Sequence, residues 1–340
     1  MRLSERLQKA WYAENGRDWL SVALLDVSWL YGSLMKLRRK LYANGVMHST
    51  RLPVPVIVVG NVIAGGAGKT PIVIELARFL TQQGYQAGIV SRGYGRHSKE
   101  VLEVLSDTPV SDSGDEPALI KRVQSTPVFV ANERADAAQA LLAAYPQTNV
   151  ILCDDGLQHL SLQRDIEICV FDERGIGNAR LLPAGPLREP WPKTVDFVLH
   201  RGSFEAAGNS FAIERQLADF ALAADGTRIA LGDLADKNLI ALAGIAQPEA
   251  FFHMLRERGL TLSERIALPD HYVFDSLKRT FYKGDCLICT EKDAVKLWQT
   301  PLAQSCQIIA APLRVSLPEA FTVALLSKLT EKLSSLLTMK

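Results

Sequence analysis

The sequence contains few cysteines for its length. Only five occur among 340 residues, and a chain that can bury a core of this size needs no disulfide framework. We therefore expect a reducing compartment. Cys286 and Cys289 have C-x-x-C spacing, but they lie in an apolar run that predicts a strand, on which residues three apart point to opposite faces. Hence we expect two buried structural cysteines rather than a metal site.

The sequence also lacks an excess of charge of either sign. Its 38 lysines and arginines against 37 aspartates and glutamates give a net charge of +1, so the composition does not indicate a nucleic-acid partner. The apolar share of 48% and the charged share of 22% are typical of a globular protein. Because the chain exceeds the roughly 100 to 200 residues of one domain, we expect two domains. No feature of the sequence indicates an obligate protein partner.

A long uninterrupted apolar run is absent as well. The stretch from Trp19 to Leu37 is largely apolar, but Asp26, Ser28 and Gly32 interrupt it. A membrane-spanning helix needs about 20 predominantly apolar residues, and a carboxylate near its middle is costly. We therefore expect a helix that lies on one leaflet or dips into it. The alternative is an amphipathic helix packed on the body of the protein.

Residues at both ends of this stretch favour contact with a membrane surface. Tryptophans stand at positions 11, 19 and 29, and a basic cluster follows at residues 36–40. Tryptophan prefers the membrane interface, and basic residues are attracted to anionic cytoplasmic lipid. No small-residue cleavage site follows a basic segment, so we expect no signal peptide. We predict that residues 1–45 form an N-terminal membrane-associated helical segment, peripheral or monotopic at the cytoplasmic face.

A glycine-rich loop is the clearest functional pattern. Val54 to Gly60 predicts a strand, Asn61 to Gly68 a loop, and Pro71 to Leu80 a helix. Glycines let backbone amides turn toward phosphate oxygens, and the helix N-terminus adds its positive dipole end. The strict phosphate-loop pattern has a glycine where this chain has Ile63. The residues that we predict to hold the nucleotide are Ile63, Ala64, Gly65, Gly66, Ala67, Gly68, Lys69 and Thr70.

Within this loop, two residues have predicted roles in binding ATP with Mg²⁺. Lys69 would bridge the β- and γ-phosphates, and the Thr70 hydroxyl would bind the metal. Further on, a buried strand at residues 150–153 ends in Asp154 and Asp155. An acid at a strand tip can hold Mg²⁺ directly or through water, so we predict that both carboxylates lie near the metal. A solvated turn is the alternative.

Two other loops carry candidate contacts. Arg92 and Tyr94 follow a predicted strand, and ligand loops gather at the carboxyl ends of parallel strands, so both are candidates for contacting the nucleotide or the acceptor. A plain glycine turn is the alternative. Asp115 precedes a predicted helix at residues 118–123 and could be its N-cap. The functional interpretation is a carboxylate that accepts the proton of an attacking hydroxyl.

These motifs together resemble the tetraacyldisaccharide 4′-kinases, the lipid A 4′-kinases of Gram-negative bacteria. The resemblance runs through nearly the whole chain. The matching segments, in order, are VGN at 59–61 with GGAGKTP at 65–71, SRGYG at 91–95, GDEP at 114–117, DDGLQH at 154–159, LPAGPLRE at 182–189, PDHY at 269–272 and TEKDAVK at 290–296.

The resemblance implies an enzyme that transfers the γ-phosphate of ATP to the 4′-hydroxyl of a tetraacylated glucosamine disaccharide 1-phosphate, giving lipid IVA. It implies the cytoplasmic face of the inner membrane, ATP and Mg²⁺, and two α/β domains with the active site in the cleft between them. The implied catalytic residues are Asp115, His271, Lys69 and Arg188. The implied metal-site residues are Thr70, Glu116, Asp154 and Asp155. The implied substrate contacts are Asn61, Arg92, Tyr94, Gln158 and His159.

The predicted fold is α/β, with a phosphate-loop domain built on a mostly parallel sheet at residues 46–205 and a smaller α/β domain at 206–340. The polar stretch at 201–209 suggests the connection between them. Later strands and helices alternate as in a small α/β unit. Thr290 is a predicted N-cap with Asp293 at the capping-box position.

Two rival classes share parts of this pattern. Nucleotide-switch ATPases of the partitioning type also have a double-glycine loop and contact membranes, but they carry a lysine where this chain has Ala64. GTP-dependent delivery or scaffold proteins need a guanine-binding segment of the form Asn/Thr-Lys-x-Asp. In Thr290-Glu291-Lys292-Asp293 the lysine abuts the aspartate, which counts against that class. The alternative function is therefore a membrane-associated nucleotide switch without a lipid substrate.

Overall fold

The computed structural model describes residues 3–13, 18–202, 208–274, 277, 281–282 and 284–338. The chain forms two compact units that interleave along the sequence. Unit 1 comprises Met1–Arg92, Ala131–Ile213 and Leu317–Lys340, and unit 2 comprises Gly93–Val130 and Glu214–Ser316. The sequence boundaries at 45/46 and 205/206 stay a prediction, and part of the polar stretch around the second boundary lies outside the described residues.

Unit 1 is built on parallel strands. The strands are β1 (Val56–Gly60), β2 (Ala87–Ser91), β5 (Val150–Asp154), β6 (Ile166–Phe171), β7 (Phe197–His200) and β8 (Ser210–Ala212). They lie in the order β2-β5-β1-β6-β7-β8, and every neighbouring pair is parallel. All residues of β1, β2 and β5 are buried. This burial matches their continuous β-branched and apolar sequence, which is typical of strands covered on both faces. The predicted parallel α/β fold is confirmed.

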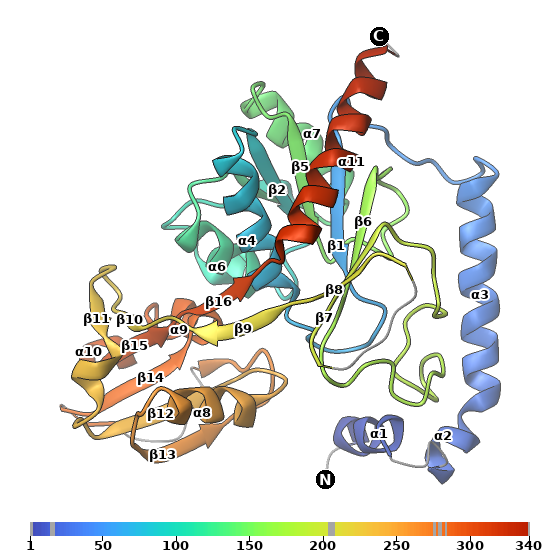
Figure 1. Cartoon of the computed structure of the whole chain (residues 1–340). Helices are drawn as coiled ribbons and strands as arrows, with labels where there is room; N and C mark the ends of the chain where they lie inside the picture. The colour runs from blue at the N-terminus through green and yellow to red at the C-terminus, as the bar shows by residue number, and fades with distance from the viewer. Residues whose placement is uncertain are drawn as a thin grey trace. The chain divides into compact units, whose positions relative to one another are not determined.

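Three helices of unit 1 accompany this sheet: α4 (Lys69–Gln82), α7 (Arg134–Ala144) and α11 (Glu319–Thr338) (Figure 1). Helix α11 joins the body through aromatic contacts, because the ring of Phe321 lies 5.4 Å from that of Phe197 and 5.5 Å from that of Phe211. An ion pair between Lys328 and Asp196 adds to this contact. Residues from the end of the chain therefore complete the core of the unit that contains its start.

The N-terminal part of unit 1 contains α1 (Leu3–Trp11), α2 (Trp19–Ala23) and α3 (Leu25–Ala43). The predicted single helix from Trp19 to Leu37 is thus broken at Leu24. The break allows separate anchoring of the two pieces. Ser21 of α2 donates to the carbonyl of Ala10 at 3.4 Å, whereas Ser28 of α3 donates to the carbonyl of Leu181 at 2.8 Å. Among the helices of the described residues, none has the length and apolarity needed to cross a membrane.

Helix α3 has two different sides. Ser28 and Gly32 are buried against the body of unit 1, and a Cβ at Gly32 would lie 2.7 Å from the Leu181 side chain. The other side exposes large apolar groups, most strongly Trp29, which is 76% exposed. The exposed apolar residues of α2 and α3 are Trp19, Val22, Leu25, Val27, Trp29, Leu30, Leu34 and Leu37. We call this set the apolar face of α2 and α3.

Unit 2 contains a second, mixed sheet in the order β11-β10-β15-β14-β12-β13. Its strands are β10 (Phe220–Leu222), β11 (Arg228–Ala230), β12 (Leu239–Ala243), β13 (Leu262–Ala267), β14 (Cys286–Thr290) and β15 (Gln307–Ala311). The four strands from β15 to β13 are parallel, and β10 and β11 add antiparallel edges. The described residues of the unit also form two short antiparallel pairs: β3 (Leu102–Glu103) with β4 (Val128–Val130), and β9 (Glu214–Leu217) with β16 (Leu313–Ser316).

The cysteines of β14 confirm the strand argument. Cys286 belongs to a core cluster with Phe251 and Leu255, whereas Cys289 belongs to a different cluster with Leu297. The two thiols therefore point to opposite faces of the sheet, and burial raises the pKa of each. No group of three or more metal-ligating side chains occurs in the part of the chain that the structure describes.

Among its described residues, unit 2 contains the helices α5 (Val110–Ser113), α6 (Asp115–Val123), α8 (Pro248–Glu257), α9 (Glu291–Leu297) and α10 (Leu302–Ser305), and a 3-10 turn η1 (Leu231–Leu234). Helix α9 begins directly after β14, and Thr290 is its N-cap, with its hydroxyl accepting from the Asp293 amide at 3.1 Å. The predicted cap is confirmed. Helices α6 and α9 lie against one another, which brings two distant parts of the sequence together.

Candidate functional site

The first candidate cluster lies at the carboxyl edge of the sheet in unit 1. Strands β1 and β5 are parallel neighbours with Val59 opposite Asp154, so the segments that follow both strands meet at the same edge. After β1, Gly65 has φ +94° and Gly68 has φ +67°. Only glycine adopts such angles without strain. Gly68 is the N-cap of α4, and the helix begins at Lys69, two residues before the predicted Pro71.

Lys69 is held between an amide and a carboxylate. Its ammonium lies 3.3 Å from Asn61 Oδ1 and 3.3 Å from Asp155 Oδ1, and the residue is only 8% exposed. Asn61 in turn donates its Nδ2 to the Gly65 carbonyl at 3.3 Å, so it ties the lysine to the glycine loop. The structure thus brings together three residues that the sequence places on separate segments.

Asp155 is the centre of this cluster. It has φ +50°, an uncommon conformation for a residue other than glycine. Its carboxylate, 31% exposed, forms ion pairs with Lys69 and with Arg188, whose Nη1 lies 3.3 Å from Oδ2. Burial raises the pKa of the Asp155 carboxyl, but the opposing attraction of Lys69, Arg188 and Arg134 is larger in sum and holds that pKa below its usual range. The carboxylate is therefore ionised at neutral pH.

The remaining loop residues take defined places around this cluster. Ile63, which replaces the usual first glycine, is fully buried and pairs with Leu187, and the Ala64 amide donates to the Pro186 carbonyl at 2.7 Å. The loop is thus fixed by the LPAGPLRE segment rather than by a glycine turn at position 63. Thr70 is the second residue of α4 and is buried, and Asp154 is the buried last residue of β5.

Two arginines of this cluster were not among the predicted residues. Arg134, the first residue of α7, is buried and donates Nη2 to the Asp155 carbonyl at 2.8 Å. Arg174 donates Nη2 to the Gly66 carbonyl at 2.8 Å and pairs with the buried Asp172. Both arginines hold backbone carbonyls of the site. The position of Asp172 directly after β6 is the kind of strand-end signal that could have indicated the second arginine.

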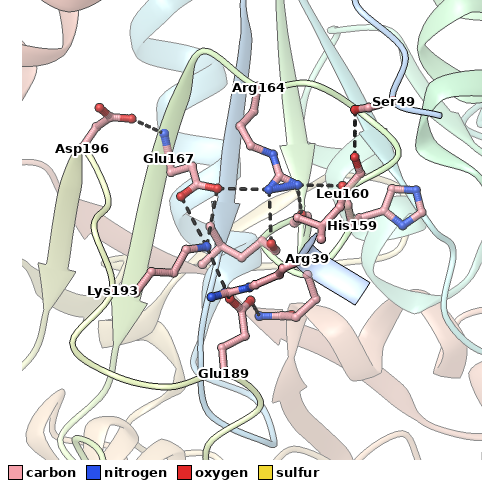
Figure 2. A network of polar contacts seen from close by, with 12 residues as sticks. Arg39, Ser49, His159, Leu160, Arg164, Glu167, Glu189, Lys193 and Asp196 are labelled. Atoms are coloured by element: carbon pink, nitrogen blue, oxygen red, sulfur yellow. Dashed lines mark hydrogen bonds and ion pairs between the residues drawn. The ribbon is translucent and has the colours of Figure 1, made fainter. Parts of the chain in front are cut away.

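A buried charge cluster supports the site from the side of α3 (Figure 2). Glu189 is 1% exposed, forms an ion pair with Arg39 of α3, and lies 3.4 Å from Lys193. Its Oε1 accepts from Gln158 Nε2 at 2.6 Å, and the same nitrogen lies 2.9 Å from the Asn61 carbonyl. Gln158 therefore braces the backbone of the glycine loop, and its predicted substrate contact stays a prediction.

His159 lies beside this cluster (Figure 2), and polar partners surround its ring. The Arg134 amide donates to its Nε2 at 3.3 Å, and Glu133 Oε2 lies 3.2 Å from the same nitrogen. Arg164 donates to the His159 carbonyl at 2.7 Å. Burial, together with the nearby positive charge of Arg134, lowers the pKa of His159 to about 4. The imidazole is therefore neutral at neutral pH.

Arg92 and Tyr94 belong to different parts of the protein. Arg92 follows β2 in unit 1 and is exposed. Tyr94 belongs to unit 2, is exposed, and places its ring 5.2 Å from that of His271. Their predicted substrate contacts stay predictions.

The second candidate cluster lies in unit 2 and centres on Asp115. The N-cap of α6 is Gly114, with φ +89°, and Asp115 is the first residue of the helix. The expectation of an Asp115 cap is thus wrong, because its carboxylate makes other contacts. Oδ2 lies 3.1 Å from His271 Nδ1 and 3.0 Å from Lys296 Nζ. The predicted pairing of Asp115 with His271 is present in the structure.

Charge around Asp115 keeps it ionised. Burial raises the pKa of the Asp115 carboxyl, but the hydrogen bond from His271 and the charges of Lys296 and Lys292 hold that pKa below its usual range. The backbone of His271 has φ +58°, an uncommon angle for a residue other than glycine. Glu116, the second residue of α6, is half-buried beside this cluster.

Lys292 and Lys296 are functional candidates that the sequence reasoning passed over. They lie one turn apart on α9, so both point to the same side of the helix. Lys292 contacts His271 Nε2 at 3.2 Å and Asp270 Oδ1 at 2.9 Å. Lysines spaced by four in the TEKDAVK segment were the available signal, since this spacing places both amines on one face.

The fold is of the parallel α/β class, with a glycine loop, an enclosed lysine and paired acids at the carboxyl edge of its larger parallel sheet. The model of the tetraacyldisaccharide-1-P 4′-kinase family matches residues 20–330. The chain therefore belongs to this family.

Individual relatives agree with this assignment. A tetraacyldisaccharide 4′-kinase of Polaromonas sp. is 56% identical over 324 residues, which cover 94% of this chain and 96% of the relative. The corresponding kinase of Polaromonas naphthalenivorans is 54% identical over 338 residues, 98% of this chain and 97% of the relative. A crystal structure of LpxK from Aquifex aeolicus in complex with ATP has a TM-score of 0.78 and 29% identity, and the match covers 92% of this chain and 99% of that one.

Proposed function

We propose that this chain transfers the γ-phosphate of ATP to the 4′-hydroxyl of a tetraacylated glucosamine disaccharide 1-phosphate and so forms lipid IVA in lipid A biosynthesis. The observation that carries the proposal is the match over nearly the full length to kinases of that name, at 54% to 56% identity for the two Polaromonas relatives. The two clusters supply side chains suited to each part of the reaction.

ATP binding is assigned to residues 63–70 as a phosphate loop. Gly65 and Gly68 turn the backbone toward the start of α4, where free amides and the helix dipole favour phosphate. The contacts from Lys69 and Arg188 to Asp155, at 3.3 Å, are longer than the roughly 2.7 to 2.9 Å of a strong charge-assisted bond. Both cations can therefore turn to phosphate oxygens at little cost, Lys69 to the β- and γ-phosphates and Arg188 to the transferred group.

The same loop offers ligands for Mg²⁺. Magnesium in phosphotransferases takes one or two carboxylates, phosphate oxygens and water rather than a complete protein cage. Thr70 at the start of α4 and Asp154 and Asp155 at the tip of β5 fit that requirement, and Glu116 is a further candidate acid. When bound, the metal would neutralise charge that develops on the phosphates.

Proton transfer is assigned to Asp115. As the 4′-oxygen attacks the γ-phosphorus, its proton passes to the carboxylate, and the bond from the γ-phosphorus to the bridging oxygen of ADP breaks. His271 holds that carboxylate in place through the 3.1 Å contact. A base that is ionised at neutral pH can accept the proton without a prior step.

The lipid substrate gives the apolar face of α2 and α3 a role. We assign this face to the inner-membrane surface on the cytoplasmic side, where acyl chains of the substrate are available. Asn61, Arg92, Tyr94, Gln158 and His159 are the candidate contacts of the disaccharide. Basic residues at 36–40, near the end of α3, would favour anionic headgroups.

A transfer assay tests the kinase proposal. Purified full-length protein is incubated with ATP labelled at the γ-phosphate and a tetraacyldisaccharide 1-phosphate in mixed micelles. We expect the label at the 4′-position of the lipid, with ADP formed in equal amount. ATP turnover without labelled lipid would contradict the proposal and favour the nucleotide-switch alternative.

A vesicle assay tests the membrane assignment separately. The double variant Trp29→Ser with Leu34→Ser removes two exposed apolar side chains of α3. Burial of one such side chain contributes about 1.5 to 3 kcal/mol, so we expect at least a tenfold weaker partition to anionic phospholipid vesicles. Val323→Ser, on the exposed side of α11, is the matched control and should bind as the wild type does. Equal flotation of all three proteins would contradict the assignment.

A further inference from the structure

More charged side chains surround Asp115 and His271 than a carboxylate and a histidine need for proton transfer. Two lysines of α9 and one further aspartate contact the pair. The contacts form a chain in the order Asp270, Lys292, His271, Asp115, Lys296. All of these side chains are half-buried or buried. Two long side chains held in this way lose rotamer freedom, which is a cost that needs an offsetting gain.

The hydrogen-bond partners of His271 determine which nitrogen of its neutral ring carries the proton. A lysine ammonium can only donate, so the contact of Lys292 Nζ with His271 Nε2 at 3.2 Å requires a lone pair on Nε2. The proton of the neutral ring is then on Nδ1, which lies 3.1 Å from Asp115 Oδ2 and donates to it.

Lys296 acts on the other member of the pair. Its ammonium lies 3.0 Å from Asp115 Oδ2 and 3.0 Å from the Tyr272 carbonyl, and it lies over the Phe274 ring, 5.1 Å from the centroid. These three contacts fix the position of the charge. Lys296 and His271 both contact Oδ2, which leaves Oδ1 as the oxygen that would receive the substrate proton.

We propose that Lys296 and Lys292 are positioning residues for the Asp115–His271 pair. Lys296 holds the carboxylate turned so that it presents Oδ1, and Lys292 holds His271 as the Nδ1–H tautomer. The inference rests on the proposed role of Asp115 as the base of the kinase. Neither lysine needs to touch the lipid or ATP for this role.

Among the described residues, three other titratable groups lie near the pair: Glu116, Asp270 and Tyr94. Helix α6 contributes Glu116, whose charge acts on Lys292. Asp270 comes from the segment between β13 and β14, and Tyr94 places its ring against His271. Asp270 is bound to Lys292 at 2.9 Å, so it offsets that lysine more than it affects Asp115. Lys296 is therefore the cation whose removal changes the environment of Asp115 most directly.

The separate effects on kcat and on KM test the role of Lys296. Lys296→Met removes the 3.0 Å contact to Asp115 Oδ2, so kcat should fall about tenfold, while the KM values for ATP and for the lipid should change less than about twofold. Lys296→Arg, which keeps the charge and a donor, should recover most of kcat. Lys237→Met, at an exposed position of unit 2, is the matched control and should keep the wild-type kcat. Wild-type kcat in Lys296→Met, or a raised KM with unchanged kcat, would overturn the inference.

A nitrogen-15 spectrum of labelled histidine tests the role of Lys292 without using activity. His271→Gln assigns the His271 signals by their disappearance. We expect the Nδ1–H tautomer in the wild type and a larger share of Nε2–H in Lys292→Met. An Nε2–H ring in the wild type, or an unchanged tautomer in Lys292→Met, would overturn the inference.

The variant Asp115→Asn separates failure of this inference from failure of the proposed base. If Asp115→Asn keeps wild-type kcat, the base assignment is wrong whatever the lysine variants do. If Asp115→Asn is inactive while Lys296→Met keeps the wild-type kcat, the base assignment stands and the lysine inference fails. Far-UV circular dichroism of each variant confirms that the comparison is between folded proteins.

Discussion

The two clusters each hold one carboxylate between two positively charged or hydrogen-bonding groups, but they do so in different ways. Asp155 in unit 1 lies on a strand tip, and its contacts to Lys69 and Arg188 are both 3.3 Å. Asp115 in unit 2 lies at a helix start, and its contacts to Lys296 and His271 are 3.0 and 3.1 Å. The Asp155 side chain is also about twice as exposed, at 31% against 14%.

This difference fits two separate roles, nucleotide binding for the first cluster and proton transfer for the second. Long contacts on a more open carboxylate suit cations that must release it and turn to incoming phosphate. Shorter contacts on a more enclosed carboxylate suit a group that keeps one orientation while it receives a proton. We therefore expect variants of the first cluster to change nucleotide binding and variants of the second to change the rate of transfer.

The largest expected effect is that of Asp115→Asn. The amide keeps the shape of the side chain but cannot take the substrate proton, so kcat should fall by about 10² to 10⁴. The KM for ATP should change little. Asp107→Asn, at an exposed position of the same unit, is the control and should keep wild-type kcat. If steady-state assays found kcat of Asp115→Asn within a few-fold of the wild type, the assignment of proton transfer to the cluster in unit 2 would be wrong.

A somewhat smaller effect is expected for Lys69→Met. Removal of a preorganised charge from developing charge in phosphoryl transfer costs about 10² to 10³ in rate, and here ATP should also bind more weakly. Arg78→Met, near the far end of the same helix, removes a half-buried ion pair with Glu75 and serves as the control. Unchanged ATP affinity in Lys69→Met, measured by calorimetry, would contradict the assignment of phosphate binding to unit 1.

His159 allows a test of stability in the first cluster. Its pKa of about 4 in the folded protein is below the ordinary 6.5, so the unfolded chain binds a proton that the folded chain does not. Stability is therefore lost as the pH falls from 6.5 toward 4, by about 2 kcal/mol between pH 7 and pH 5. His159→Gln should lose less over this interval than the wild type.

Urea unfolding at both pH values measures this loss, with the exposed His48→Gln as the control. Equal losses in the wild type and in His159→Gln would mean that the histidine is not the group responsible.

The smallest effect is expected at the cap of α9, the helix that carries both lysines of unit 2. Thr290→Ala removes the acceptor for the Asp293 amide and should lower the free energy of unfolding by about 1 kcal/mol. Thr290→Ser should restore most of it. If neither substitution alters thermal stability, the cap is not a determinant of the position of α9.

The sequence predicts the first cluster better than the second. Lys69 and Asp155 follow two apolar strands, and parallel strands in one sheet bring their carboxyl ends to one edge. The local sequence pattern and one topological rule are therefore enough to predict that Lys69 and Asp155 lie close together. The contacts of Lys296 with Asp115 depend instead on α6 lying against α9, which no local pattern specifies. Only the resemblance to a family paired His271 with Asp115, which lies 156 residues away.

Long-range burial also explains the other differences. Glu189 pairs with Arg39 across 150 residues. The single helix predicted over residues 19–37 is broken between Ser21, which bonds to Ala10 of α1, and Ser28, which bonds to Leu181. Ile63 occupies a glycine position of the usual loop because residues 186–188 hold the backbone there. In each case a tertiary contact overrides what the neighbouring residues favour.

Equilibrium ATP binding measured beside single-turnover transfer, for the wild type, Lys69→Met and Asp115→Asn, tests the central claim most directly. If the two clusters have separate roles, Asp115→Asn binds ATP as the wild type does but transfers phosphate to the lipid disaccharide 1-phosphate far more slowly. Lys69→Met loses both ATP binding and phosphate transfer. Wild-type transfer by Asp115→Asn, or an equal loss of ATP binding in both variants, would contradict it.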